Sequence, residues 1–205
     1  MKILLAITGA SGSIYGLRLL EELLRSANHV TLVASESGLE VCRYETGVVL
    51  GDAEGLKQRL SLPDANISIR AVNDLWAPEA SGSAAPDAMV IAPCSMGTAG
   101  RIAAGISSNL IERAADVMLK ENRPLLLVPR ETPFSSIHLE NLLKLSRCGA
   151  RIVPAMPAFY QKPESLDDLV NFVVGKALDQ LGLEHTLFSR WGGLEAERSL
   201  INKSF

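Results

Sequence analysis

The stretch KILLAITGASGSIYGLRLLEELLRSANHVTLVAS, residues 2–35, decides the fold. Its apolar run Ile3–Thr8 predicts a buried strand, and the glycines and serine after it predict a turn. Apolar residues then recur at helical spacing over Ile14–Leu24, and His29–Ala34 forms a second apolar run. A strand, a turn, a helix and a strand in this order make the repeating unit of a parallel sheet.

The rest of the chain continues the alternation of strands and helices. Further strands are predicted at Ile67–Val72, Ala88–Ala92, Leu125–Val128 and Ala150–Val153. Helices are predicted at Ser37–Tyr44, Gly51–Leu62, Asn109–Lys120, His138–Arg147 and Ser165–Leu181, and helical spacing also runs up to Ala103. The stretch Ala77–Pro86 is rich in Ala, Ser, Gly and Pro, which indicates a loop. We therefore expect one doubly wound α/β domain over residues 1–185, Rossmann-like or flavodoxin-like with a mainly parallel sheet, and a C-terminal tail over 186–205.

The composition excludes several classes of protein. The chain has 205 residues, 47% of them hydrophobic and 21% charged, with a net charge of -3, as in ordinary globular proteins. No basic block suggests nucleic acid, and no apolar run is long enough to span a bilayer. The first apolar run is too short for a secretory signal. The cysteines Cys42, Cys94 and Cys148 have no metal-like spacing, so we expect free thiols, no metal and a cytoplasmic location.

The residues that follow the strands are the first candidates for a ligand site, because ligands of open parallel sheets bind beyond the carboxyl ends of the strands. Small and hydroxyl-bearing residues follow the first, second and fourth strands, at Thr8–Gly12, Ser35 and Cys94–Thr98, and Arg130–Thr132 follows the fifth. They suit a phosphate or an isoalloxazine ring, although Ser35 can equally be a helix cap. The turn lacks the G-x-G-x-x-G fingerprint, and no acidic residue follows the second strand in the place that would hold an adenosine ribose, so FMN fits better than NAD.

Six motifs now carry a resemblance to a known family. In chain order they are TGASGSIYG, WAPEASGS, APCSMGT, NLIERAADVMLKE, LVPRETPFSSIH and PAMPAFY. Their order and spacing, from about Lys2 to Gly192, resemble the UbiX-type flavin prenyltransferases. The resemblance implies a metal-independent transfer of the dimethylallyl group of dimethylallyl phosphate to N5 and C6 of reduced FMN. It also implies delivery of prenylated FMN to a UbiD-type decarboxylase, in ubiquinone biosynthesis or aromatic-acid breakdown, and a homododecamer with sites at subunit interfaces.

The resemblance also assigns residues by position. The flavin-binding set that it implies comprises Gly9, Ala10, Ser11, Ser35, Ser95, Met96, Gly97, Thr98 and Arg130. The prenyl-phosphate set comprises Lys120, Arg130, Glu131, Tyr160, Lys176 and Trp191, of which Glu131, Arg130 and Lys120 are the expected catalytic residues. Several relatives have Arg where this chain has Lys176, and Lys keeps the charge without the bidentate fork.

These assignments make chemical sense at a site where phosphate leaves. Developing negative charge needs cations and hydrogen-bond donors, which Arg130, the lysines and the Tyr160 hydroxyl supply. Glu131 can then handle a proton, during departure of phosphate or rearomatisation. The alternative is a surface pair between Arg130 and Glu131, which is a poor explanation because adjacent side chains rarely face each other.

Two other functions remain open from the residues. A flavin-dependent decarboxylase on the same fold would need a His on the first helix, which this chain lacks, and a Pro-Ala-Ser-Ala-Asn-Thr-type segment where it reads APCSMGTAG. A non-catalytic FMN carrier would leave the charged prenyl-phosphate set without a task. Outside the site we expect His138 to be a cap or core contact, Cys94 a small buried residue, and Tyr15 and Trp76 packing groups.

Overall fold

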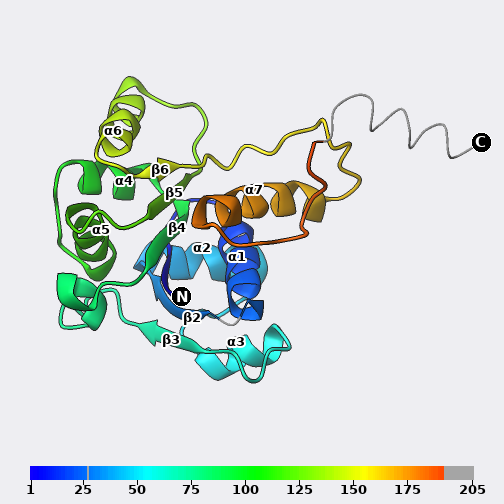
Figure 1. Ribbon diagram of the computed structural model, residues 1–205, viewed down its shortest axis with the longest axis horizontal. Coiled ribbons are helices and arrows are strands. Elements are labelled where there is room, and N and C mark those ends of the chain that lie inside the picture. Colours follow the sequence, from blue (N-terminus) through cyan, green and yellow to red (C-terminus); the bar gives the residue numbers. More distant parts are fainter. Residues whose placement is uncertain (27, 192–205) are drawn as a thin grey trace, which may run out of the picture.

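The computed structural model describes residues 1–26 and 28–191. It contains one six-stranded sheet in the order β3-β2-β1-β4-β5-β6, with every pair of neighbours parallel (Figure 1). The strands are β1 Lys2–Ile7, β2 His29–Ala34, β3 Ile67–Arg70, β4 Ala88–Cys94, β5 Leu125–Pro129 and β6 Arg151–Ile152. The predicted α/β class is confirmed, and this strand order is the doubly wound order of dinucleotide-binding folds.

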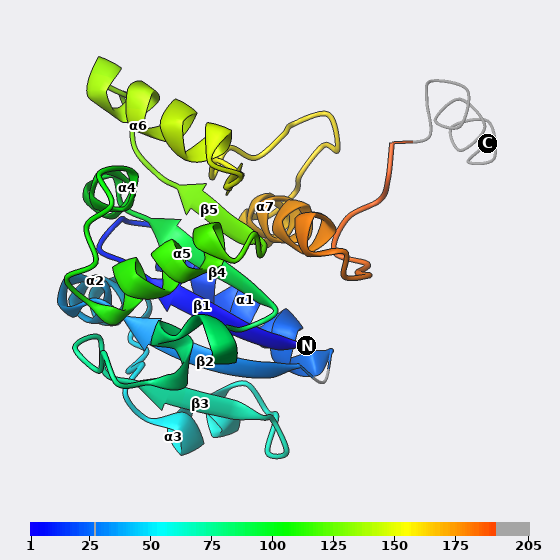
Figure 2. The ribbon, with the colours of Figure 1, turned by 60° about the vertical axis from the view of Figure 1, so that its left-hand side comes forward.

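Helices cover both faces of the sheet (Figure 2). They are α1 Ser13–Arg25, α2 Glu36–Thr46, α3 Ala53–Arg59, α4 Met96–Ala103, α5 Leu110–Lys120, α6 Ser136–Arg147 and α7 Leu166–Leu181. Buried residues of α1, α2, α3 and α7 share one apolar cluster, and those of α4, α5 and α6 share the other. The predicted loop at 77–86 contains two short 3-10 turns, Pro78–Ala80 and Gly82–Ala84.

The two covered faces explain why the strands read as continuous apolar runs. Leu5 and Ile7 of β1 point into the first cluster, while Leu4 and Ala6 point into the second. All seven residues of β4 are buried. A sheet with one face in water would alternate apolar and polar residues, so the unbroken runs are those of a parallel sheet buried on both sides.

Strand ends differ slightly from the predicted ones. β4 continues through Pro93 to Cys94, two residues beyond the predicted end, with an irregular register against β5 after Ile91. β3 ends at Arg70 rather than Val72. None of the helices in the described ranges is long and apolar enough to cross a membrane.

The connections after β1 and β4 run to opposite sides of the sheet, although these two strands are neighbours. Such a switch point leaves a crevice beyond the carboxyl ends of the two strands, where ligands of doubly wound folds bind. The fold thereby places the turn 8–12 and the start of α4 on either side of one crevice.

Candidate functional site

Thr8 joins the ends of β1 and β4. Its hydroxyl donates to the Pro93 carbonyl at 2.8 Å and accepts from the Ser95 N–H at 2.8 Å, and the residue is fully buried. The turn after it needs its glycines. A Cβ on Gly9 would lie 2.4 Å from the Ser37 hydroxyl oxygen, and Gly12 has a φ of +103°, which favours glycine. The close approach at this turn therefore serves packing against α2.

The start of α4 forms the other wall of the crevice. The Ser95 hydroxyl accepts from the Thr98 N–H at 3.3 Å and lies 3.0 Å from the Thr98 hydroxyl, so these two side chains cap the helix. No hydrogen bond within residues 1–26 and 28–191 uses the N–H groups of Met96 or Gly97, and Gly97 is exposed. Within the predicted segment Ser95–Thr98, these two amides are the donors left for a ligand.

An ion pair between the exposed Arg101 and the buried Glu112 braces this helix start. Arg101 donates to the Thr98 hydroxyl at 3.4 Å and forms an ion pair with Glu112 of α5, whose side chain is 1% exposed. The Ser108 N–H also donates to Glu112, at 2.9 Å. Burial alone would raise the pKa of the Glu112 carboxyl, but the bonds from Arg101 and Ser108 outweigh it and the pKa is lowered.

Arg130 reaches across the crevice from the end of β5. Its Nε donates to the Ser11 carbonyl at 2.9 Å, which places the guanidinium beside the turn after β1. Glu131 accepts instead from the Thr132 N–H at 3.0 Å. The two side chains therefore have separate partners, as the sequence predicted, and both are half-buried.

Glu45 also lies at this turn, and the sequence analysis missed it. Its carboxylate accepts from the N–H groups of Gly12 at 3.0 Å and Ser13 at 2.9 Å. Burial opposes ionisation of Glu45, but these bonds and one from the Ser11 hydroxyl lower its pKa. Glu45 belongs to no motif beside the turn, and only the packing of α2 on α1 brings it there, so the sequence offered no signal for it.

Three residues of the predicted prenyl-phosphate set form a second group. The Tyr160 ring lies edge-on to the Trp191 ring, with centroids 5.7 Å apart, and edge-on to Phe172 of α7 at 6.0 Å. The Lys176 ammonium lies 5.6 Å from the Phe172 centroid. It also lines a cleft of about 300 Å³ with Met156 and Pro154. A hydrogen bond from the Ala155 N–H to the Pro129 carbonyl, at 3.0 Å, ties this region to the end of β5.

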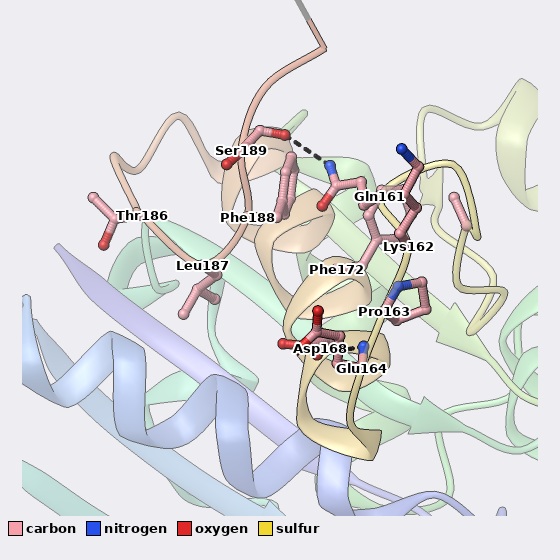
Figure 3. Close-up of a pocket in the computed structure, with 11 residues that line it drawn as sticks. Gln161, Lys162, Pro163, Glu164, Asp168, Phe172, Thr186, Leu187, Phe188 and Ser189 are labelled. Atoms are coloured by element: carbon pink, nitrogen blue, oxygen red, sulfur yellow. Dashed lines mark hydrogen bonds between the residues drawn. The ribbon is translucent and has the colours of Figure 1, made fainter. Parts of the chain in front are cut away.

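A second cleft, of about 420 Å³, lies between the loop 158–164 and the segment 186–189, with Phe172 in its wall (Figure 3). Gln161 donates to the Ser189 carbonyl at 2.7 Å and so joins the two segments. Residues 192–205 of the predicted tail lie outside the described residues. The part that is described, up to Trp191, runs alongside α7.

Lys120 is not brought to this edge of the sheet. It ends α5, just before β5 begins, whereas Arg130 follows the other end of β5. Five strand residues at about 3.3 Å each separate the two positions by roughly 16 Å along the strand. Lys120 pairs instead with Glu121 at 2.6 Å, beside Gly82, where a Cβ would lie 2.9 Å from its nitrogen.

The other singled-out residues can be compared with their predicted roles. His138 accepts from the Ser135 N–H at 3.2 Å in a capping box at the start of α6, as predicted. Cys94 is fully buried, which raises the pKa of its thiol to about 12. Tyr15 packs against the core. The prediction that Trp76 packs is wrong within this chain, where it is 98% exposed.

Comparison with known proteins shows which family the chain belongs to. The family model described as Flavoprotein matches residues 1–178. The flavin prenyltransferase UbiX of Halalkalibacterium halodurans is 54% identical over 187 residues, which cover 91% of each chain. The chain belongs to the UbiX flavin prenyltransferase family. The predicted family is thereby confirmed.

Solved structures of the UbiX family have the same fold. One is AnUbiX (PadA1) in complex with FMN and dimethylallyl pyrophosphate, with a TM-score of 0.85, 42% identity, and coverage of 94% of this chain and 97% of that one. Another is a dodecameric FMN-dependent Ubix-like decarboxylase from Escherichia coli O157:H7, with a TM-score of 0.85 and 44% identity over 94% of this chain and all of that one.

Proposed function

We propose that this chain transfers the dimethylallyl group of dimethylallyl phosphate to N5 and C6 of reduced FMN. The observation that carries the proposal is the meeting of Arg130, from the end of β5, with the turn after β1 at the switch point of the sheet. A cation beside small, amide-rich turns suits two phosphorylated substrates. Membership of the flavin prenyltransferase family supports the same reaction.

The residues at the crevice fit FMN. The turn Gly9–Ser11, Ser35 at the end of β2, and the start of α4 would hold it, with the N–H groups of Met96 and Gly97 as donors. Ser95 and Thr98 would act mainly by fixing that helix start, since their hydroxyls already bond within the chain. Reduced FMN supplies the nucleophilic nitrogen and carbon atoms. Arg130 lies where it can bond both to the flavin and to a prenyl phosphate.

Departure of phosphate breaks a carbon–oxygen bond and develops charge on oxygen. Arg130 and Lys176 would stabilise that charge, and the Tyr160 hydroxyl would donate to it. Glu131 would carry the proton that moves as the new bonds form. Trp191, edge-on to Tyr160, would fix the ring of that residue and cover the dimethylallyl group.

We propose that the site is completed by a second copy of the chain. Lys120 and Arg130 lie at opposite ends of β5, so a Lys120 that contacts a leaving phosphate beside Arg130 must come from another subunit. The dodecameric relative supports a homododecamer, with the tail 186–205 at an interface. We further propose a cytoplasmic location, consistent with free thiols at Cys42, Cys94 and Cys148, and a UbiD-type decarboxylase as the recipient of prenylated FMN.

Mass spectrometry of the flavin tests the reaction directly. Purified protein is incubated with reduced FMN and dimethylallyl phosphate without added metal, and the flavin is then extracted. We expect its mass to rise by one isoprene unit, with release of inorganic phosphate. Flavin recovered unchanged, with the protein folded and FMN bound, would refute the transferase.

Co-expression of two inactive variants tests the shared site. Lys120→Ala and Arg130→Ala should each be inactive alone. In mixed oligomers about a quarter of the sites combine an intact Lys120 from one copy with an intact Arg130 from another, so activity should return to that extent. Mixed oligomers without activity would show that each chain builds its own site.

The decarboxylase remains the second candidate, since one similar structure bears that name. Arg130, Lys176 and Glu131 have no evident task in removing carbon dioxide. Incubation with aromatic acids or cysteinyl carboxylates and FMN, followed by measurement of carbon dioxide, separates the two. We expect none above the level without enzyme.

A further inference from the structure

After α7 the chain turns back and lies along that helix. We call residues 184–190 the clamp segment. Its Leu187 and Phe188 pack against the core cluster, and its Ser189 carbonyl accepts from Gln161 (Figure 3). Trp191 follows directly, so the position of the clamp segment decides where the Trp191 ring meets Tyr160.

Asp179, near the end of α7, holds the clamp segment at two points. The Arg190 guanidinium donates to both carboxylate oxygens, at 2.6 and 3.2 Å. His185 Nε2 lies 3.1 Å from the carboxylate, and the Leu187 N–H donates to His185 Nδ1 at 3.3 Å, so Nε2 carries the hydrogen and donates. The Arg190 bonds lower the pKa of Asp179 against the opposing effect of burial, and His185 adds to them.

Phe188 of the clamp segment also sets the position of Lys176. The Lys176 nitrogen lies 5.3 Å from the Phe188 centroid and 5.6 Å from that of Phe172, within the range of cation–π attraction to both rings. Gly175 allows this contact. A Cβ there would lie 2.5 Å from the Phe188 ring and 2.7 Å from the His185 ring.

We propose that Asp179 is a positioning residue of the prenyl-phosphate site, which anchors the clamp segment and thereby fixes the Lys176 ammonium and the Trp191 ring beside Tyr160. The inference rests on the proposed function, because that function makes these three residues ligands of the prenyl phosphate. A site held in its bound geometry loses less entropy when the substrate binds. Asp179 therefore favours binding without touching the substrate.

Limited proteolysis tests the anchor without any need for activity. Trypsin must take up several residues on either side of Arg190, so it should cleave there faster when the clamp segment leaves α7. In Asp179→Asn we expect the fragment 1–190 to form several-fold faster than in the parent, as followed by mass spectrometry. Asp167→Asn removes the same charge from an exposed position of the same helix and should cleave at the parent rate. Equal rates in the parent and Asp179→Asn would overturn the anchor.

Calorimetric titration of dimethylallyl phosphate tests the positioning. FMN is kept oxidised, so that binding is measured without transfer. Asp179→Asn should weaken binding about five-fold, the effect of losing a partly exposed ion-pair network, with FMN affinity unchanged. Faster proteolysis with unchanged binding would overturn the positioning role. A parent protein that binds no dimethylallyl phosphate would refute the proposed function itself, while the proteolysis would still report on the anchor.

Two further variants separate positioning from loss of stability. Gly175→Ala displaces Phe188 and leaves the Asp179–Arg190 pair in place, while its gain in helix propensity, about 1 kcal/mol, offsets part of the packing cost, so binding should weaken with only a small change in the free energy of unfolding. Arg190→Gln leaves the contact of Asp179 with His185, so it should weaken binding no more than Asp179→Asn does. The double variant should bind as Asp179→Asn does, because the pair between Asp179 and Arg190 is already lost in that single variant. Additive losses in the double variant would overturn the shared mechanism.

Discussion

The crevice at β1 and β4 and the region around Tyr160 hold their side chains in different ways. At the crevice, short side chains bond to backbone groups of neighbouring elements, as Thr8 and Ser95 do. Around Tyr160, long side chains lie against aromatic rings, and Trp191 is 55% exposed. The first arrangement is fixed by the sheet, whereas the second depends on a segment that returns from the end of α7. The difference suggests that flavin binding should tolerate changes that prenyl-phosphate binding does not.

The largest expected effect concerns Glu131, which follows Arg130 after the end of β5. Glu131→Gln keeps size and hydrogen bonding but cannot take up a proton, so the rate should fall by roughly 10²–10⁴, the usual worth of a positioned acid or base. Binding of FMN and dimethylallyl phosphate should survive. Single-turnover flavin spectra at increasing dimethylallyl phosphate measure both quantities.

Two variants act as controls for Glu131→Gln. Arg130→Ala should weaken phosphate binding as well as turnover, because it removes a charge-assisted donor pair. Glu140→Gln changes an exposed acid on α6 and should have the parent rate. If Glu131→Gln also turns over at the parent rate, Glu131 is only a carboxylate near the start of a helix.

Among these variants, we expect the largest loss of stability when the ion pair between Arg101 and Glu112 is removed. Glu112→Ala removes the partner of the Ser108 N–H and of Arg101 and should lower the free energy of unfolding by about 2 kcal/mol, as for lost hydrogen bonds to a charged group, because Arg101 is 47% exposed and can turn to water. Denaturant unfolding at fixed protein concentration measures it. Asp116→Ala, which removes an exposed pair on the same helix, should cost less than about 1 kcal/mol. Equal losses would mean that the Arg101–Glu112 pair is no more important than a surface pair.

A smaller effect should single out the second region. Tyr160→Phe keeps both edge-on ring contacts but removes the hydroxyl, so dimethylallyl phosphate should bind roughly tenfold more weakly, as for one lost bond to a charged group. FMN should bind as before. Tyr44→Phe, at a site 91% exposed, is the matched control. A loss of FMN affinity in Tyr160→Phe would break the division between the two regions.

The smallest effect is a dependence of stability on pH. The pKa of Glu112 is lower in the folded chain than in the unfolded one, so its contribution is complete above the unfolded value, near about 4.3. It is lost as the pH falls through the folded value. Thermal unfolding between neutral and acid pH should therefore show a shallower acid loss in Glu112→Gln than in the parent. If the thermal unfolding temperatures of the two proteins fall in parallel with pH, Glu112 is not ionised in the folded chain.

Much of the fold could be predicted because its signals are local. The apolar runs of β1, β2 and β5 lie between turns, and the order of strands and helices leaves few topologies for a parallel sheet. His138 and Ser135 likewise sit in one helix start, where sequence spacing alone brings them into contact. Features that depend on residues close together in the sequence could therefore be predicted correctly.

Contacts between elements that are separated in the sequence could not be predicted from it. Glu45 meets Gly12 only through the packing of α2 on α1, and Asp179 meets Arg190 only because the chain turns back after α7. Spacing gave no reason to separate Lys120 from Arg130, since both stand next to the same strand. Trp76 was expected to pack because it is large and apolar, yet in this chain it lies at the surface.

The positions of Lys120 and Arg130 at opposite ends of β5 have a consequence for dilution. On the proposed shared site, a chain on its own offers Arg130 at its crevice but lacks the Lys120 of a second copy. Turnover per chain should then fall as the protein is diluted below the concentration at which copies assemble, while the folded fraction stays constant. The active unit would then be a contact between two chains, and its concentration would rise more steeply than the total concentration of the chain.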